Sequence, residues 1–150
     1  MVATMVALAL AAGCRSVGNV SAPQDTVVRM APERGQVWQL VAVRGREVSR
    51  NGRVTTLLFN LEAGNVSGQA YCNTYYADCR MAWQGGDGRC DRYSMELTGV
   101  VAGQVQCPEA VMNADSRYLA LLAKVDEAML TGGTLTLLTR GREVLKYELQ

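Results

Sequence analysis

Histidine is absent from all 150 residues of the sequence. It is the side chain that most often serves as a general base and as a metal ligand in proteins. The Ser-His-Asp, Cys-His and His-Glu-x-x-His chemistries are therefore excluded. A hydrolase or zinc enzyme of these kinds is not encoded here.

An excess of charge of one sign is also missing, because the formal net charge is +1 and only 19% of residues are charged. Domains that bind nucleic acid usually carry a marked basic stripe or patch. A balanced composition of this kind predicts neither a basic face that could hold phosphates nor an acidic tail. We therefore expect no nucleic-acid partner.

The apolar run at the N-terminus, residues 1–13, reads MVATMVALALAAG and has no charged side chain. It is too short to be a transmembrane helix, since a bilayer core of about 30 Å requires about 20 residues. Its length, and the small residues before Cys14, are typical of a secretion signal. A short buried helix followed by an ordinary core cysteine is the alternative interpretation.

The segment from Leu10 to Cys14, LAAGC, resembles the lipobox of bacterial lipoproteins, in which a peptidase cuts before a lipid-bearing cysteine. Ala11 stands where leucine is usual, and a basic stretch before the apolar run is missing. The resemblance implies that Cys14 carries lipid, and several acyl chains hold a protein at a bilayer almost irreversibly. Arg15, in place of aspartate, implies the outer membrane by the enterobacterial sorting rule.

Residues 14–35 contain two of the three prolines and no sustained apolar period. This composition predicts a flexible tether. A coil of about 20 residues would hold the following domain roughly 25 Å from the membrane on average.

Residues 36–150 are dominated by strand signals, which are short β-branched or aromatic runs separated by glycine and asparagine. The first runs are Val37–Val43, Val54–Phe59 and Val66–Tyr71. Asn51-Gly52 favours a hairpin turn between the first two runs, because both residues tolerate positive φ. The spacing predicts an antiparallel meander of about seven strands.

One helix is expected near residue 115, where Asp115 or Ser116 can cap its first turn. Four apolar residues then share one helical face, and core packing explains such a stripe better than a ligand groove does; they are Tyr118, Leu122, Val125 and Met129. The repeated Arg-Gly-Arg-Glu at 44–47 and 140–143 is interpreted as turn chemistry that happens to coincide.

Six short motifs follow one another between Gln36 and Gln150: they are Trp38-Gln39-Leu40, Val66-Ser67-Gly68, Cys72-Asn73-x-Tyr75, Cys107-Pro108, Tyr118-Leu119 and Leu135-x-Leu137. Their order resembles that of the META domain, also called the HslJ-like domain, over this whole range. Tyr71 replaces the family's usual glycine, and Gly103 replaces its usual threonine. The resemblance implies a mainly β fold with one helix (α+β), a small antiparallel β-barrel-like domain. It also implies a cell-envelope role, linked in some members to heat shock or drug tolerance, and no catalytic residues.

Four cysteines follow Cys14, with 6, 10 and 16 residues between them. These spacings do not match a zinc site built from two knuckles, so no metal is expected. An exported chain meets an oxidising compartment, which favours disulfides. Cys79 and Cys90 flank a glycine-rich turn and are expected to pair across a hairpin. The remaining pair, Cys72 with Cys107, matches the family's own cysteines, and no free thiol should be left.

The leading hypothesis is a non-catalytic envelope lipoprotein whose domain is a binding or assembly module for another envelope protein. The alternative is a carrier that encloses a small apolar or amphiphilic ligand at the barrel mouth. Enzyme activity ranks third, and no cofactor is expected. Four carboxylates around the central hairpin could act in catalytic pairs, but carboxylates near glycine-rich turns are usually only solvated; the four are Asp78, Asp87, Asp91 and Glu96. Asn73 is expected to bond nearby backbone.

Overall fold

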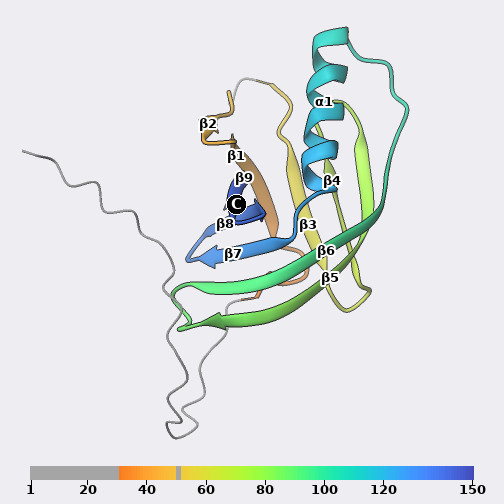
Figure 1. The fold of residues 1–150 in the computed structure, drawn as a ribbon. Helices are drawn as coiled ribbons and strands as arrows, with labels where there is room; N and C mark the ends of the chain where they lie inside the picture. The colour runs from red at the N-terminus through yellow and green to blue at the C-terminus, as the bar shows by residue number, and fades with distance from the viewer. Residues whose placement is uncertain (1–30, 50–51) are drawn as a thin grey trace, which may run out of the picture.

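The structure is a computed structural model that describes residues 31–49 and 52–150. The predicted signal peptide, Cys14 and most of the tether lie outside the described residues, as does Asn51. Nine strands form one sheet in the order β2-β1-β3-β4-β5-β6-β7-β8-β9, and β1 also pairs with β9. Eight antiparallel strands therefore close into a barrel, and the short β2 is added to β1 (Figure 1). The predicted fold class is confirmed.

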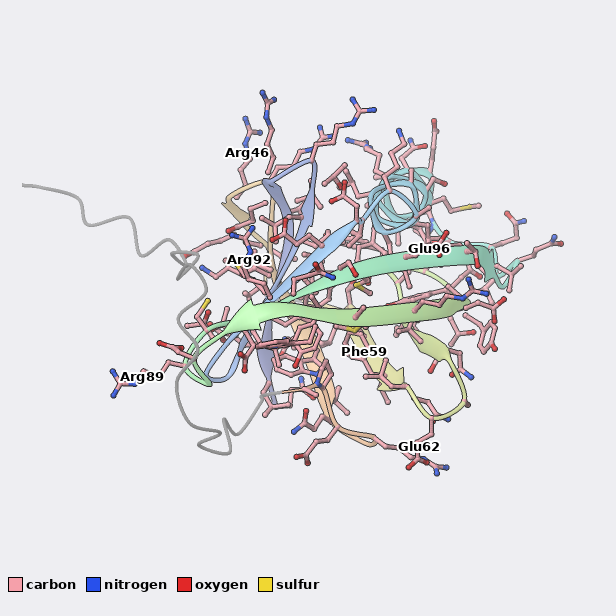
Figure 2. The ribbon with its side chains drawn as sticks, turned by 60° about the horizontal axis from the view of Figure 1, so that its bottom comes forward. Arg46, Phe59, Glu62, Arg89, Arg92 and Glu96 are labelled. Atoms are coloured by element: carbon pink, nitrogen blue, oxygen red, sulfur yellow. A yellow bond between two sulfur atoms is a disulfide. The ribbon has the colours of Figure 1, made fainter. Side chains whose placement is uncertain are left out.

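The strands are β1 (Val37–Val43), β2 (Arg46–Glu47), β3 (Thr56–Asn60), β4 (Asn65–Gln69), β5 (Thr74–Gly86), β6 (Asp91–Ala102), β7 (Glu127–Thr131), β8 (Thr134–Thr139) and β9 (Arg142–Leu149). Burial alternates along β1 and β3, as expected where one face of a strand points into a core. Bulky side chains fill the barrel interior, including Trp38, Phe59, Tyr118 and Tyr147. Most charged side chains point outward, as Glu62 and Arg89 do in Figure 2, and Asp91 and Asp115 are buried.

The single helix of the described chain, α1 (Glu109–Leu122), begins earlier than predicted and also ends earlier. Pro108 stands at its N-cap, where a fixed φ and a missing N–H are tolerated. Burial alternates with period two from Ala128 to Leu130, so Met129 belongs to β7 rather than to the helix. Within the described ranges, no helix has the length and apolar character needed to span a membrane.

The repeated Arg-Gly-Arg-Glu segments do form turns. Arg44 and Gly45 have φ of 48° and 74°, and Arg140 and Gly141 have φ of 51° and 72°. Positive φ at both central residues is the backbone that a two-residue hairpin requires. The first hairpin therefore turns at Arg44-Gly45, and the turn predicted at residues 51–52 is not the one that reverses β1. Because β1 pairs with β9, the two turns lie side by side, with the Arg44 N–H donating to the Val144 carbonyl at 2.9 Å.

Cys72 and Cys107 form a disulfide, as predicted, whereas Cys79 is a buried free thiol. The predicted pair of Cys79 with Cys90 is therefore wrong, as is the expectation that no free thiol remains. Cys79 lies opposite Leu97, while the hairpin closes beyond the pair of Gly86 with Asp91. At about 3.3 Å per residue, the seven positions from Cys79 to Gly86 span about 23 Å. Cys90 lies at the far tip of the hairpin and so cannot face Cys79.

The Cys79 thiol should be inert in the folded protein. Only 3% of the residue is exposed, and burial raises the pKa of its thiol to about 11. Because the thiolate is the reactive form, we expect no alkylation of Cys79 by iodoacetamide at pH 8 in native protein, and full alkylation in 6 M guanidinium. Peptide mapping by mass spectrometry reports the label. Rapid labelling of the native Cys79 peptide would contradict the burial described here.

Candidate binding groove

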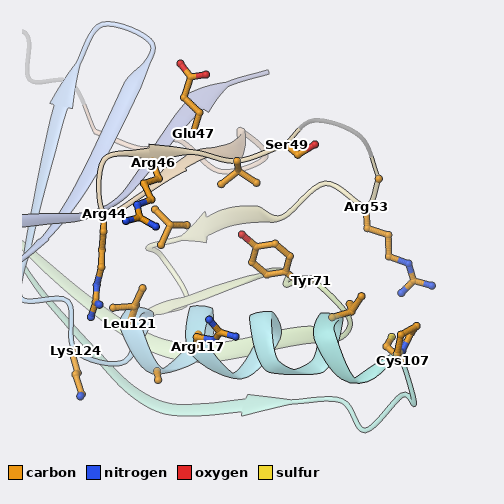
Figure 3. A pocket seen from close by; sticks show the side chains of 16 residues that line it. Arg44, Arg46, Glu47, Ser49, Arg53, Tyr71, Cys107, Arg117, Leu121 and Lys124 are labelled. Carbon is orange, nitrogen blue, oxygen red and sulfur yellow. The ribbon is translucent and has the colours of Figure 1, made fainter.

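A groove of about 1180 Å³ lies between α1 and the hairpin of β1 and β2 (Figure 3). One wall is the face of α1 that carries Arg117, Ala120 and Leu121, continued by Lys124 just beyond the end of the helix. The other wall is the chain from Val43 to Ser49, together with Gly52 and Arg53. The helix and the hairpin thus form a trough that is open to solvent along one side.

The floor of the groove is apolar. Val43, Val48, Tyr71 and Leu121 line it and pack against the buried core from outside. The Tyr71 ring meets the Tyr118 ring edge-on, with centroids 6.2 Å apart. Burial raises the pKa of Tyr71, so its hydroxyl stays neutral. Tyr71 thus gives the floor an aromatic ring.

The rim of the groove is cationic. Among the described residues, Glu47 is the only carboxylate that lines it, and five basic side chains do so: Arg44, Arg46, Arg53, Arg117 and Lys124. Arg44 and Lys124 lie at one end, Arg53 lies at the other and Arg117 lies between them (Figure 3). The ion pairs formed between two described residues are Arg34–Glu62, Arg80–Glu96 and Arg92–Glu127, and none of them includes a cation of this rim. In the described part of the chain, no carboxylate therefore neutralises a cation of this rim.

The basic surface continues around the two arginine turns. A second hollow of about 780 Å³ is lined by Arg44, Arg140 and Arg142, with Glu143 as its carboxylate. Of the 15 Lys and Arg residues in the sequence, seven of those that the structure describes line these two hollows. The expectation that no basic face would form is wrong, because the fold gathers cations from separate segments while the net charge stays at +1.

Asp115 fixes the helical wall to the barrel. Its buried carboxylate accepts hydrogen bonds from the Cys72 N–H at 2.7 Å, the Asn73 N–H at 3.2 Å and the Asn73 Nδ2 at 3.3 Å. Asn73 Oδ1 in turn accepts from the Val105 N–H at 2.7 Å. Asn73 thus bonds distant segments rather than nearby backbone, which corrects the prediction. With the Cys72–Cys107 disulfide, these bonds hold one wall of the groove in place.

A chain of buried tyrosines occupies the barrel interior beside the groove. The Tyr118 hydroxyl lies 2.9 Å from that of Tyr75 and 3.0 Å from that of Tyr147. Tyr75 also donates to the Thr56 carbonyl at 2.8 Å. Burial raises the pKa of all three tyrosines well above the ordinary value, so they stay neutral. Their side chains fill the space that a ligand inside the barrel would need.

The four candidate carboxylates do not converge on one site. Asp78 pairs with Thr98 across the hairpin, and Glu96 pairs with Arg80. Asp87 accepts hydrogen bonds from the N–H groups of Arg89 and Cys90 at the tip of the β5–β6 hairpin, and these bonds lower the pKa of its carboxyl group. Asp91 is fully buried and accepts from Trp83 Nε1 at 3.4 Å. Among the described residues, no group of three or more Cys, Asp or Glu side chains could hold a metal ion.

Comparison with known proteins places this fold in a family. The model of the META domain matches residues 31–150. An NMR structure that is 21% identical covers 80% of this chain and 95% of its own, with a TM-score of 0.55. An NMR structure of a protein from Burkholderia xenovorans is 16% identical and covers 88% and 99%, with a TM-score of 0.53. Both support the fold alone, and no curated protein matches the sequence.

Proposed function

Since this chain belongs to the META domain family, we propose that it acts as a non-catalytic binding module of the cell envelope, whose partner is another envelope protein. The observation that carries this proposal is the groove, which combines an apolar floor with five cationic side chains. The absence of histidine and the separation of the four carboxylates favour binding over catalysis.

The same proposal includes anchoring of the domain at the outer membrane through lipid on Cys14. The lipobox-like LAAGC sequence supports it. The described chain enters the barrel just before Val37, and the groove lies at the other end of β1, beyond Val43. At about 3.3 Å per residue, the two ends are about 20 Å apart. A tethered domain of this shape presents its groove away from the entering chain. We also propose a role in envelope stress or drug tolerance, as the resemblance to the family implies.

A second candidate function is carriage of a small amphiphilic ligand. The apolar floor around Tyr71 favours it. Ligand pockets usually have about 300–1000 Å³ and bury most of the ligand surface. This groove is larger and is open along one side, and the barrel interior is filled with side chains. A protein partner therefore suits the geometry better.

Photocrosslinking in intact cells tests the proposed function. A photoreactive residue at Ala120, which is exposed in the groove, should give an adduct with one envelope protein. The same residue at exposed Ala82 on β5 is the matched control and should give none. A soluble form that begins at Arg15 should give less adduct, because anchoring raises the effective concentration near a membrane-bound partner. Adducts with lipid alone, or equal adducts from both sites, would overturn the protein-binding proposal.

A further inference from the structure

The groove also indicates the chemistry of its partner. We propose that it binds an extended acidic segment of a protein, with carboxylates spaced along the segment and one apolar side chain seated against Tyr71. This inference rests on the proposed function, because it specifies the ligand of the same groove. Three observations carry it: the length of the groove, the spacing of its cations and the nature of its floor.

The length of the groove suits a peptide in extended conformation. The part of α1 that runs along the groove, from Val111 to the last helical residue Leu122, is about 17 Å long at 1.5 Å per residue. Five residues of an extended chain cover the same distance at about 3.3 Å each. The opposite wall contains β2, which has a strand on one side only within the described sheet. A segment that lies along this wall could add to the open edge of β2, as extended peptides do at other sheet edges.

The cations are spread along the groove rather than gathered at one point. Arg44 and Lys124 lie at one end, and Arg53 lies at the far end (Figure 3). A single phosphate or carboxylate would need several donors converging on one spot. Separated cations instead suit several carboxylates along one chain, and such charge complementarity raises both association rate and specificity. Each rim cation is solvent-exposed and without a carboxylate partner among the described residues.

The floor distinguishes an acidic peptide from a uniform polyanion. Val48, Tyr71 and Leu121 offer apolar contact within the groove, and Glu47 would repel an unbroken run of negative charge. A protein segment can alternate carboxylates with an apolar side chain, whereas a phosphate backbone carries charge at each repeat. The mixed lining therefore favours an acidic protein segment over nucleic acid.

Fluorescence anisotropy with the full chain tests this proposal. The probe is a fluorescein-labelled peptide, Glu-Leu-Glu-Glu-Phe-Glu-Asp-Glu, and the comparison probes are its Lys-for-Glu analogue and a ten-residue oligothymidine. We expect the acidic peptide to bind and both comparison probes to bind at least ten-fold more weakly. Arg117→Glu should weaken peptide binding at least ten-fold. Arg89→Glu makes the same charge change at the β5–β6 tip, outside the groove, and should leave binding within about two-fold.

Other outcomes decide against the proposal in distinct ways. Equal weakening by Arg117→Glu and Arg89→Glu would indicate attraction by net charge alone and would overturn the groove as the site. Tighter binding of oligothymidine than of the peptide would overturn the acidic protein segment in favour of nucleic acid. If the acidic peptide does not bind the chain but the Ala120 adduct forms in cells, the proposal of an acidic partner segment is overturned. The proposed function would then still stand. Circular dichroism of each variant shows whether the fold is intact.

Discussion

Replacing Gly68 by alanine should destabilise the barrel by about 3 kcal/mol or more, which is the upper range for overpacked core positions. A Cβ at this position of β4 would lie 2.0 Å from the Thr56 carbonyl oxygen and 2.8 Å from the Tyr75 hydroxyl. The carbonyl belongs to the backbone and cannot rotate away, so β3 and β4 would have to separate. The change would also disturb the hydrogen bond from Tyr75 to Thr56, which begins the buried tyrosine chain.

Equilibrium unfolding in urea measures this effect, and Gly133→Ala is the matched control. A Cβ at Gly133 meets nothing nearer than 3.9 Å, and the residue does not have positive φ. We expect Gly133→Ala to change the free energy of unfolding by less than about 1 kcal/mol. If both variants unfold at the same urea concentration, the close approach of β4 to Thr56 is wrong.

Much of the fold could be predicted from the sequence, because side chains alternate between the two faces of a strand and this alternation is visible in a short segment. Buried and less buried side chains alternate over residues 37–43, as they do in a strand with one face toward the core. The two arginine turns likewise depend only on a local Arg-Gly pair with positive φ. The helix ends were harder to predict. Val125 and Met129 continue a helical spacing from Tyr118, yet Ala128 and Leu130 are also spaced for a strand, and pairing with β8 decides between the two.

The error at Cys79 has a related cause. A glycine-rich turn predicts a hairpin but does not fix how many residues lie between the turn and a given cysteine's partner. Register places Cys79 opposite Leu97, and only the closed barrel sets that register. The prediction that Cys79 pairs with Cys90 therefore lacked the strand register on which it depended. The prediction of the Cys72–Cys107 bridge followed a family pattern, and this bridge is present.

The basic groove was not predictable from composition, because its cations come from segments far apart in the sequence. Arg44 and Arg46 lie at the β1–β2 turn, Arg117 lies on the helix and Lys124 lies just beyond its end. One local signal was available, since positions 117 and 124 are seven apart, which is the spacing of one helical face. Their meeting with Arg44 depends on how α1 packs on the barrel, which no single segment encodes.

Removing the Cys72–Cys107 disulfide should lower the free energy of unfolding by about 4 kcal/mol, as the loop-closure relation gives for the 35 residues that the bridge closes. Cys79→Ala should cost only about 1 kcal/mol, because it removes one buried sulfur and no cross-link. Guanidinium unfolding under non-reducing conditions measures both.

The double variant Cys72→Ala with Cys107→Ala supplies the sharpest control for this prediction. Each single substitution already abolishes the same bridge, so the double variant should be no less stable than the less stable single variant. Additive losses would instead show that each cysteine stabilises the domain through separate packing. The bridge lies where Asp115 joins the helix to the Cys72-Asn73 loop, and Cys107 itself lines the groove. We therefore expect the domain without this bridge to bind the acidic peptide more weakly, because the helical wall would no longer be fixed relative to the hairpin. The weaker binding should be seen even under conditions in which circular dichroism shows the domain to be folded.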